Sequence, residues 1–374
     1  MSSRRTRSPI RWKERVRGNW RRLNGPSRIA GVDLARGLAV IGMFAAHLLL
    51  TADRFIWTDP STWTAVVDGR SSILFATLAG VSIGLVTGGR TPFPGARMTW
   101  ALWRLVLRAL MLLVLGILLI LTGVPVFVIL PAYAILFLLA LPFTRLSARV
   151  VLWTAAAIAV IMPFVQPALD ALPIWDEPFR DELDAMIGWH YPFTVWLAFV
   201  LAGLGIARAG VTRTAVQVRM LVGGAALAAG GYGLAELTAP AGGAYWDDVW
   251  TAEPHSSGVL EVVGSGGFAI AVLAACLLLC RIDAVRMLTL PVRATGAMPL
   301  TAYTAQLLVW AGVMLIAFGD TTDYFGFIML EPFWPMTIGT LLACTAWALV
   351  LGRGPLERLL ARATRSVGQD AAAR

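Results

Sequence analysis

Long apolar stretches dominate the chain, and short polar segments separate them. A helix needs about 20 apolar residues to cross the hydrocarbon core of a bilayer, and only helices and closed barrels can span it. The ten stretches cover approximately 31–52, 71–89, 100–122, 124–144, 149–167, 191–209, 215–237, 259–280, 296–318 and 327–352. They are continuous rather than alternating, which disfavours a barrel. The pattern predicts an all-α, polytopic integral membrane bundle of about ten transmembrane helices.

The composition supports this interpretation. Hydrophobic residues make up 58% of the chain and charged residues 14%, and the mean hydropathy is +0.72. Soluble domains average about 45–50% apolar and about 25% charged residues. The composition therefore excludes a soluble domain. The net charge of +9 does not indicate nucleic-acid binding, because the positive residues lie between the apolar stretches.

The basic residues divide unequally between the two sides of the predicted bundle. When alternate connections are assigned to opposite sides, 28 of the 31 lysines and arginines fall on one side, and only Arg54, Arg70 and Arg180 fall on the other. Basic residues accumulate on the cytoplasmic side of membrane proteins. The distribution predicts that both termini are cytoplasmic and that the protein is a multi-pass protein of the plasma membrane.

Three regions follow from this topology. Residues 1–28 form a basic cytoplasmic or interfacial segment, residues 29–352 the transmembrane domain, and residues 353–374 a basic cytoplasmic tail. Within the first region, residues 10–23 have the composition of a helix that lies on anionic lipids. This region is too basic for a cleaved signal peptide.

Small residues and cysteines indicate packing roles. The seventh stretch contains two glycine pairs, Gly223–Gly224 and Gly230–Gly231, which suit close helix contacts and allow a homodimer. The three cysteines lie inside apolar stretches, so we interpret them as packing residues: Cys276, Cys280 and Cys344. No cluster of histidine and cysteine has metal-ligand spacing, so we expect no metal site.

Ionisable residues inside a membrane are costly and are therefore functional candidates. Asp33 and Arg36 lie three residues apart on one helical face, at the cytoplasmic end of the first stretch, and can pair. The pair is either a structural anchor or a site in which Arg36 holds the phosphates of a cytosolic cofactor.

His47 belongs to the same stretch, fourteen residues after Asp33. At 1.5 Å per residue this is about 21 Å along the axis, in the outer half of the membrane. A histidine there is either a hydrogen-bonded packing residue or the general base of a polar cavity.

Further polar residues gather at the outer ends of other stretches. Asp68 and Arg70 precede the second stretch, His255 and Glu261 lie near the start of the eighth, and Gln306 belongs to a polar stripe of the ninth. Each alone fits a structural role. Together they indicate a polar cavity that opens outward.

Two acidic outer loops could form a lid over such a cavity. They span about 168–190 and 238–258, and they carry Trp175, Trp189, Trp246 and Trp250. Tryptophan also gathers at membrane interfaces without any catalytic role, so ordinary solvated loops are the alternative.

Three segments resemble one known family. Residues 28–47 read RIAGVDLARGLAVIGMFAAH, residues 68–80 read DGRSSILFATLAG, and residues 296–304 read GAMPLTAYT. The first resembles the opening of the transmembrane acyltransferase superfamily. All three resemble its heparan-α-glucosaminide N-acetyltransferase-like branch.

The resemblance implies that acetyl-CoA, or another acyl-CoA, binds from the cytoplasm and that its acyl group passes to an extracytoplasmic sugar or glycolipid. His47 would be the general base, and Arg36 and Asp33 would form a structural or cofactor-facing pair. On electrostatic grounds, Arg104 and Arg108 could meet the phosphates of coenzyme A.

The chain departs from the family pattern at two places. A histidine of the eukaryotic members would fall near Thr58, where Asp59 could substitute, and Gln306 stands where bacterial relatives carry histidine. His47 and His255, with Asp68, remain the candidate catalytic residues. A transporter or flippase and a non-catalytic scaffold remain alternatives, although the chain lacks the paired, broken helices typical of transporters.

Overall fold

The computed structural model describes residues 9–26, 28–52, 55–56, 58–237 and 243–369, and this part of the chain contains helices and no strand. The fold class predicted from the sequence is therefore confirmed. Residues 1–8 of the basic N-terminal segment, residues 238–242 of an outer loop, Arg54 and the last residues of the tail, 370–374, lie outside the described residues.

Each of the ten predicted stretches contains a helix. Among the described residues, eight helices are long and apolar enough to span a membrane, and two shorter apolar helices accompany them. The ten are α2 (Ala30–Leu48), α3 (Arg70–Val86, which forms a span together with the preceding η1, Pro60–Val66), α4 (Gly95–Ile120), α5 (Leu130–Ala140, continued by the 3₁₀ turn η2, Leu141–Arg145), α6 (Ala148–Asp170), α8 (Phe193–Ala209), α9 (Thr214–Leu237), α11 (Val259–Leu279), α14 (Pro299–Phe318) and α16 (Phe333–Val350).

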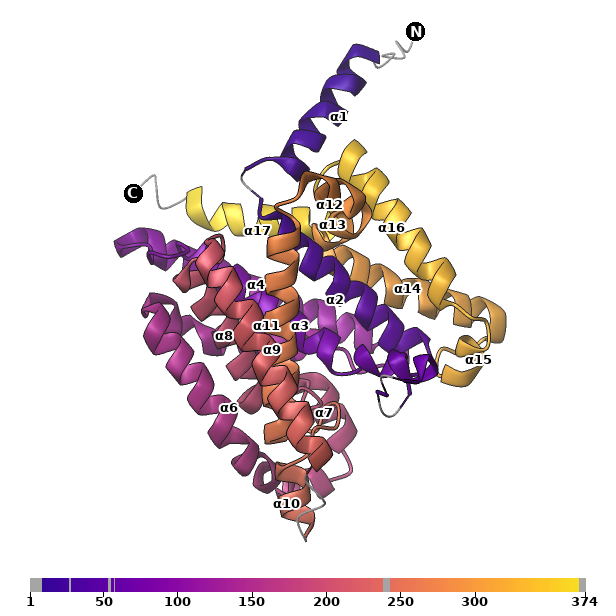
Figure 1. The fold of residues 1–374 in the computed structure, drawn as a ribbon. Coiled ribbons are helices and arrows are strands. Elements are labelled where there is room, and N and C mark those ends of the chain that lie inside the picture. Colours follow the sequence, from indigo (N-terminus) through magenta and orange to yellow (C-terminus); the bar gives the residue numbers. More distant parts are fainter. Residues whose placement is uncertain (1–8, 27, 53–54, 57, 238–242, 370–374) are drawn as a thin grey trace.

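Shorter helices occupy the two ends of the bundle. They are α1 (Pro9–Asn24), η1 (Pro60–Val66), η3 (Pro173–Asp176), α7 (Arg180–Ile187), α10 (Ala244–Val249), α12 (Asp283–Leu288), α13 (Leu290–Gly296), α15 (Tyr324–Ile328) and α17 (Pro355–Gln369). Figure 1 shows α1, α12, α13 and α17 at one end, and α7, α10 and α15 at the other. Both terminal helices thus lie at the same end of the molecule.

Helix α2 packs against α3, α11 and α13. The contact with α13 depends on two glycines. A Cβ atom at Gly296 would overlap the carbonyl oxygen of Asp33, and one at Gly37 would overlap that of Val292. Because only hydrogen fits at these positions, the two helices approach closely and hold the acidic residue at the start of α2 in a fixed place.

The glycine-rich seventh stretch, α9, packs against α11 as its composition predicts. A Cβ atom at Gly224 would lie 2.7 Å from the backbone nitrogen of Ala271, and one at Gly231 would lie 2.6 Å from that of Gly264. Gly223 and Gly230, by contrast, face open space. This open face could receive a second copy, so a homodimer stays a prediction. The three cysteines are buried thiols, as expected for packing residues.

Proline shifts the starts of two predicted spans toward the C-terminus. The fourth span begins at Leu130 rather than near residue 124, because Gly123 adopts a φ of +71° and Pro125 disfavours helix at the residue before it. The ninth begins at Pro299, and Gly296 ends the separate helix α13. Pro125, Val126, Phe127 and Ile129, in the loop before α5, line a cavity at one end of the bundle.

Candidate functional site

A cavity of about 280 Å³ lies at the end of the bundle that carries α15, where α2 ends and α3, α5 and α8 begin. Its lining combines imidazoles, phenols and a carboxylate with apolar side chains. The lining residues are Met43, Ala46, His47, Val67, Asp68, Gly69, Ser71, Ser72, Pro125, Val126, Phe127, Ile129, His190, Tyr191, His255, Tyr303 and Tyr324. All three histidines of the chain therefore meet in one cavity.

His47 lies in the last turn of α2, half-buried. Its Nδ1 atom is 3.4 Å from the amide Nε2 atom of Gln306 on α14. No described residue bonds the Nε2 atom of His47, and the Oε1 atom of Gln306 is buried without a partner. Since a glutamine side chain can present either its oxygen or its NH₂ group, Oε1 could instead accept Nδ1–H and leave Nε2 of His47 as the basic nitrogen.

His255 lies in the loop before α11, and its Nε2 atom is 3.5 Å from Oδ1 of Asp68. Asp68 is 37% exposed and precedes α3. Arg70, which follows Asp68 closely in the sequence, binds elsewhere: its guanidinium donates to the hydroxyl of Tyr232 and the carbonyl of Ala65. The carboxylate of Asp68 is therefore left facing the imidazole of His255.

The loop that carries His255 has an unusual backbone. His255 and Ser257 adopt φ angles of +65° and +59°, a region that costs non-glycine residues about 1–3 kcal/mol each. Glu261, in the first turn of α11, compensates for this strain. Its carboxylate accepts the backbone N–H groups of His255 at 2.7 Å and Ser257 at 2.6 Å, and the hydroxyl of Ser256 at 3.2 Å.

His190, which the sequence did not single out, completes the cluster of imidazoles. Its ring stacks on Phe127 at a centroid distance of 3.8 Å and lies 4.6 Å from the ring of His255. Asp184 accepts its backbone N–H at 2.8 Å. Burial lowers the pKa of His190 to about 3, and the neighbouring charge of His255 acts in the same direction. His190 is therefore neutral at physiological pH.

The predicted lid tryptophans do not line the cavity in the described part of the chain. Trp175 stacks on Trp189, whose indole N–H donates to Asp170. Asp59, considered as a substitute base, is exposed and accepts the N–H and hydroxyl of Ser61 at the start of η1. It caps a turn and lines no part of the cavity.

A second group of polar side chains, Asp33, Arg28 and Arg36, lies at the opposite end of α2. Asp33 is almost completely buried and accepts two hydrogen bonds of 2.7 Å from Arg28. The predicted partner Arg36 is a weaker one, at 3.4 Å, and it donates its stronger bond to Ser82 at 2.7 Å. Two arginines thus share one carboxylate, so this group carries a net positive charge.

The two further candidates for binding phosphate differ in their surroundings. Arg104 is exposed on α4. Arg108, one turn later, lies over the ring of Phe137 and within electrostatic range of Arg36, and its Nε atom is buried without a partner. Arg108 therefore extends the positive group.

A family model described as the catalytic region of heparan-α-glucosaminide N-acetyltransferase matches residues 28–229, more than half of the chain. The chain belongs to this family. Heparan-α-glucosaminide N-acetyltransferases use acetyl-CoA as the acetyl donor. No curated protein matches the chain at a significant level.

The matched region of this N-acetyltransferase family member includes most of the residues described above. His47, Asp68 and His190 lie within it, as does the positive group around Asp33. His255 lies beyond it, in the part that completes the outer cavity. The matched region thus includes residues at both ends of α2.

Proposed function

We propose that this protein is an acetyltransferase of the cell membrane that moves an acetyl group from cytosolic acetyl-CoA to a hydroxyl or amine of an extracytoplasmic sugar or lipid-linked glycan. The observation that carries the proposal is the meeting of His47, His190 and His255 with Asp68 in one outer cavity. Acyl transfer to a hydroxyl or amine needs a base near the acceptor, and imidazole is the commonest such group.

His47 is our candidate for the general base, because the described residues leave its Nε2 atom without a partner. When Gln306 accepts Nδ1–H, Nε2 holds the lone pair that takes the proton from the acceptor. The acceptor oxygen or nitrogen then attacks the thioester carbonyl, the acetyl–oxygen or acetyl–nitrogen bond forms, and coenzyme A leaves as the thiolate. The proton held by His47 can return to that sulfur.

His255 and Asp68 are proposed to bind the acceptor. The exposed carboxylate of Asp68 can accept sugar hydroxyl groups, and Glu261 holds the imidazole of His255 in place through the backbone. His190 is neutral and stacked, so its role would be to shape the wall of the cavity rather than to transfer a proton.

The donor would bind from the opposite end. Arg36 and Arg108 have guanidinium groups suited to phosphate oxygens, and Arg36 lies eleven positions before His47, about 16 Å along the axis of α2. A donor whose phosphates lie at the inner end would therefore have to extend its thioester through much of the bundle to reach the base.

The test is acetyl-CoA turnover by purified protein in detergent, with a mixture of amino sugars and lipid-linked sugars as acceptors. We expect His47→Ala to bind acetyl-CoA like the wild type and to lose transfer by at least about 100-fold, the usual contribution of a general base. Asp59→Asn, which changes a carboxylate outside the cavity, should retain activity. Failure of well-folded wild type to bind acetyl-CoA would reject the proposal.

A further inference from the structure

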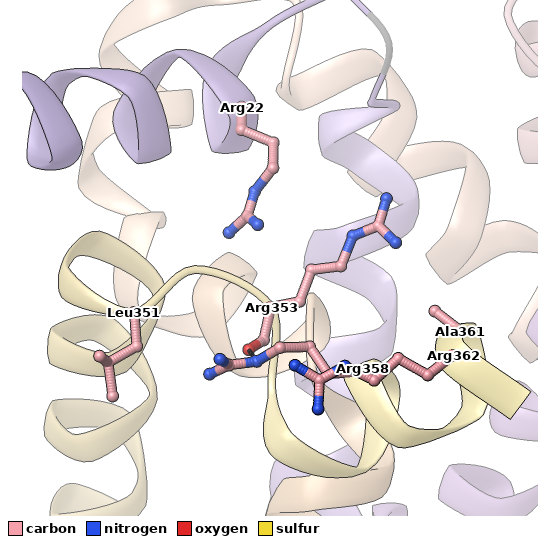
Figure 2. A pocket seen from close by; sticks show the side chains of 6 residues that line it. All are labelled: Arg22, Leu351, Arg353, Arg358, Ala361 and Arg362. Atoms are coloured by element: carbon pink, nitrogen blue, oxygen red, sulfur yellow. Dashed lines mark hydrogen bonds between the residues drawn. The ribbon is translucent and has the colours of Figure 1, made fainter.

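A second cavity lies at the end of the bundle that carries both termini. It occupies about 290 Å³ between α1, the end of α16 and α17. Four of its six lining residues are arginines: the lining is Arg22, Leu351, Arg353, Arg358, Ala361 and Arg362. Figure 2 shows Arg22 pointing from α1 toward the α16–α17 loop and α17, which carry the other three.

These four arginines have no anionic partner among the described residues, because no ion pair joins any of them to a carboxylate. The carboxylate of α17, Glu357, is engaged elsewhere. It accepts the backbone N–H groups of Leu300 and Thr301 and the hydroxyl of Thr301, at the start of α14. The positive charge of the cavity is therefore uncompensated by the described part of the protein.

Helix α1 is fixed in this position by hydrogen bonds. The amide of Asn19 donates to the carbonyls of Leu349 and Val350, at the end of α16. The buried guanidinium of Arg293 donates to the carbonyl of Leu23 and to the side chain of Asn24. The cavity is thus part of the folded structure and not a chance approach of mobile surface arginines.

The position of Arg22 is energetically unfavourable without a ligand. Its Nε atom is buried and has no hydrogen-bond partner. A Cβ atom at Gly352 would lie 2.7 Å from its Nη1 atom, so the guanidinium packs against bare backbone. Burial and the neighbouring charge of Arg353 lower the pKa of Arg22. A buried donor without a partner and without an anion is destabilising unless a ligand satisfies it.

The α17 side of the cavity is also ordered. The Nε atom of Arg358 donates to the carbonyl of Arg353 at 2.8 Å, and its guanidinium lies over the ring of Trp347 at 5.5 Å. These contacts engage one nitrogen and one face of Arg358, which leaves its terminal nitrogens to bind an anion.

We propose that this arginine cavity is a binding site for a phosphate group. Guanidinium matches phosphate geometry with paired N–H groups, and a phosphate offers several acceptor oxygens to several forks at once. Two molecules at this face of a membrane acetyltransferase carry that chemistry: an acidic phospholipid, and the nucleotide end of acetyl-CoA. The second case rests on the proposed function and the first does not.

The test variant removes charge from the cavity without removing a hydrogen bond within the protein, because the side chains of Arg22 and Arg362 donate none in the described structure. The test variant is Arg22→Gln with Arg362→Gln, and the matched control is Arg145→Gln with Arg149→Gln, which removes the same charge from exposed positions in η2 and the first turn of α6. If the test variant is not recovered folded, Arg362→Gln, at an exposed position of the same cavity, takes its place.

Two probes separate the sources of phosphate. The first is adenosine 3′,5′-bisphosphate, titrated onto full-length protein in neutral detergent. The second is the gain in Tm on moving from nanodiscs of phosphatidylcholine to nanodiscs that also contain phosphatidylglycerol. A response to the first probe assigns the site to the acyl donor, and a response to the second alone assigns it to lipid.

We expect wild type and the control to respond alike to at least one probe, and the test variant to bind the nucleotide at least about tenfold more weakly or to lose the gain in Tm. Without phosphate, the test variant should melt at or above the wild-type temperature, because like charges are removed. Wild type that responds to neither probe, or a test variant that responds as the control does, overturns the proposal. Neither readout requires transfer, so protein that binds a probe but transfers no acetyl group would reject the proposed function alone.

Discussion

Replacing Glu261 by glutamine should release the loop that carries His255. The carboxylate accepts two backbone N–H groups, from His255 and Ser257, whose φ angles are both positive. Glutamine keeps one acceptor oxygen and places an NH₂ group where the second was, so one of these bonds is lost. Hydrogen bonds to a charged group contribute about 1.5–3 kcal/mol each.

This loss is comparable to the strain of one positive-φ residue, about 1–3 kcal/mol, so the loop should open measurably more often. Since about 1.4 kcal/mol corresponds to a tenfold change in an equilibrium, the amides of 255 and 257 should exchange about 10- to 100-fold faster. Hydrogen exchange measured by mass spectrometry on peptides that cover 251–262 gives this rate directly. Acetyl transfer should fall with it, while acetyl-CoA binding stays unchanged.

The matched control is Glu253→Gln, which makes the same chemical change at an exposed position of the same loop. It should leave both the exchange rate and transfer at wild-type values. If Glu261→Gln also leaves the exchange of residues 255 and 257 unchanged, Glu261 does not hold the loop and the reasoning is refuted. Faster exchange with full transfer would instead remove His255 from the site.

Three further predictions concern other parts of the bundle. Gly296→Ala should lower the unfolding free energy by about 1–3 kcal/mol, because the added methyl group would force α13 away from α2. The loss would appear as a lower Tm, and an unchanged Tm would contradict the close contact. Asp33→Asn should cost about 2 kcal/mol and weaken binding of acetyl-CoA, because Arg28 and Arg36 lose their shared carboxylate; the checks are Tm and a binding titration. The pKa of His190 is about 3 when folded and about 6.5 when unfolded, so between those pH values only the unfolded state takes up this proton. Tm should therefore fall as the pH drops from 7 to 5, and His190→Phe should make the fall shallower.

The fold followed from the sequence because a bilayer leaves few alternatives. Each of the ten apolar stretches contains a helix, since a spanning segment must satisfy its own backbone hydrogen bonds. The boundaries near Pro125 and Pro299 were missed, because proline and glycine reshape the chain within stretches that remain apolar throughout. Hydropathy alone does not register that change.

The site was only partly predictable. His47, His255 and Asp68 were named from polarity at the outer ends of spans, but their meeting with His190 depends on how α3, α8 and α11 pack. His190 itself carried a signal that went unused, because histidine occurs only three times in the chain.

The inner end shows a different limit. Helical spacing predicted Arg36 as the partner of Asp33, but the helix begins at Ala30 and the shorter bonds come from Arg28 in the preceding loop. A residue outside the helix does not obey the three- and four-residue spacing rules that apply within it. Partners that approach from loops can therefore be found only from the folded structure.

In the proposed reaction, an acetyl group enters at the end of the bundle that carries both termini and leaves at the outer cavity. The most direct test uses sealed vesicles with uniformly oriented protein, labelled acetyl-CoA only on the side of the termini, and acceptor sugar only on the other side. With wild type, labelled sugar should appear in the acceptor compartment; with His47→Ala, none should appear. Label that appears only when donor and acceptor share one compartment, or transfer that persists without His47, would contradict the proposed reaction.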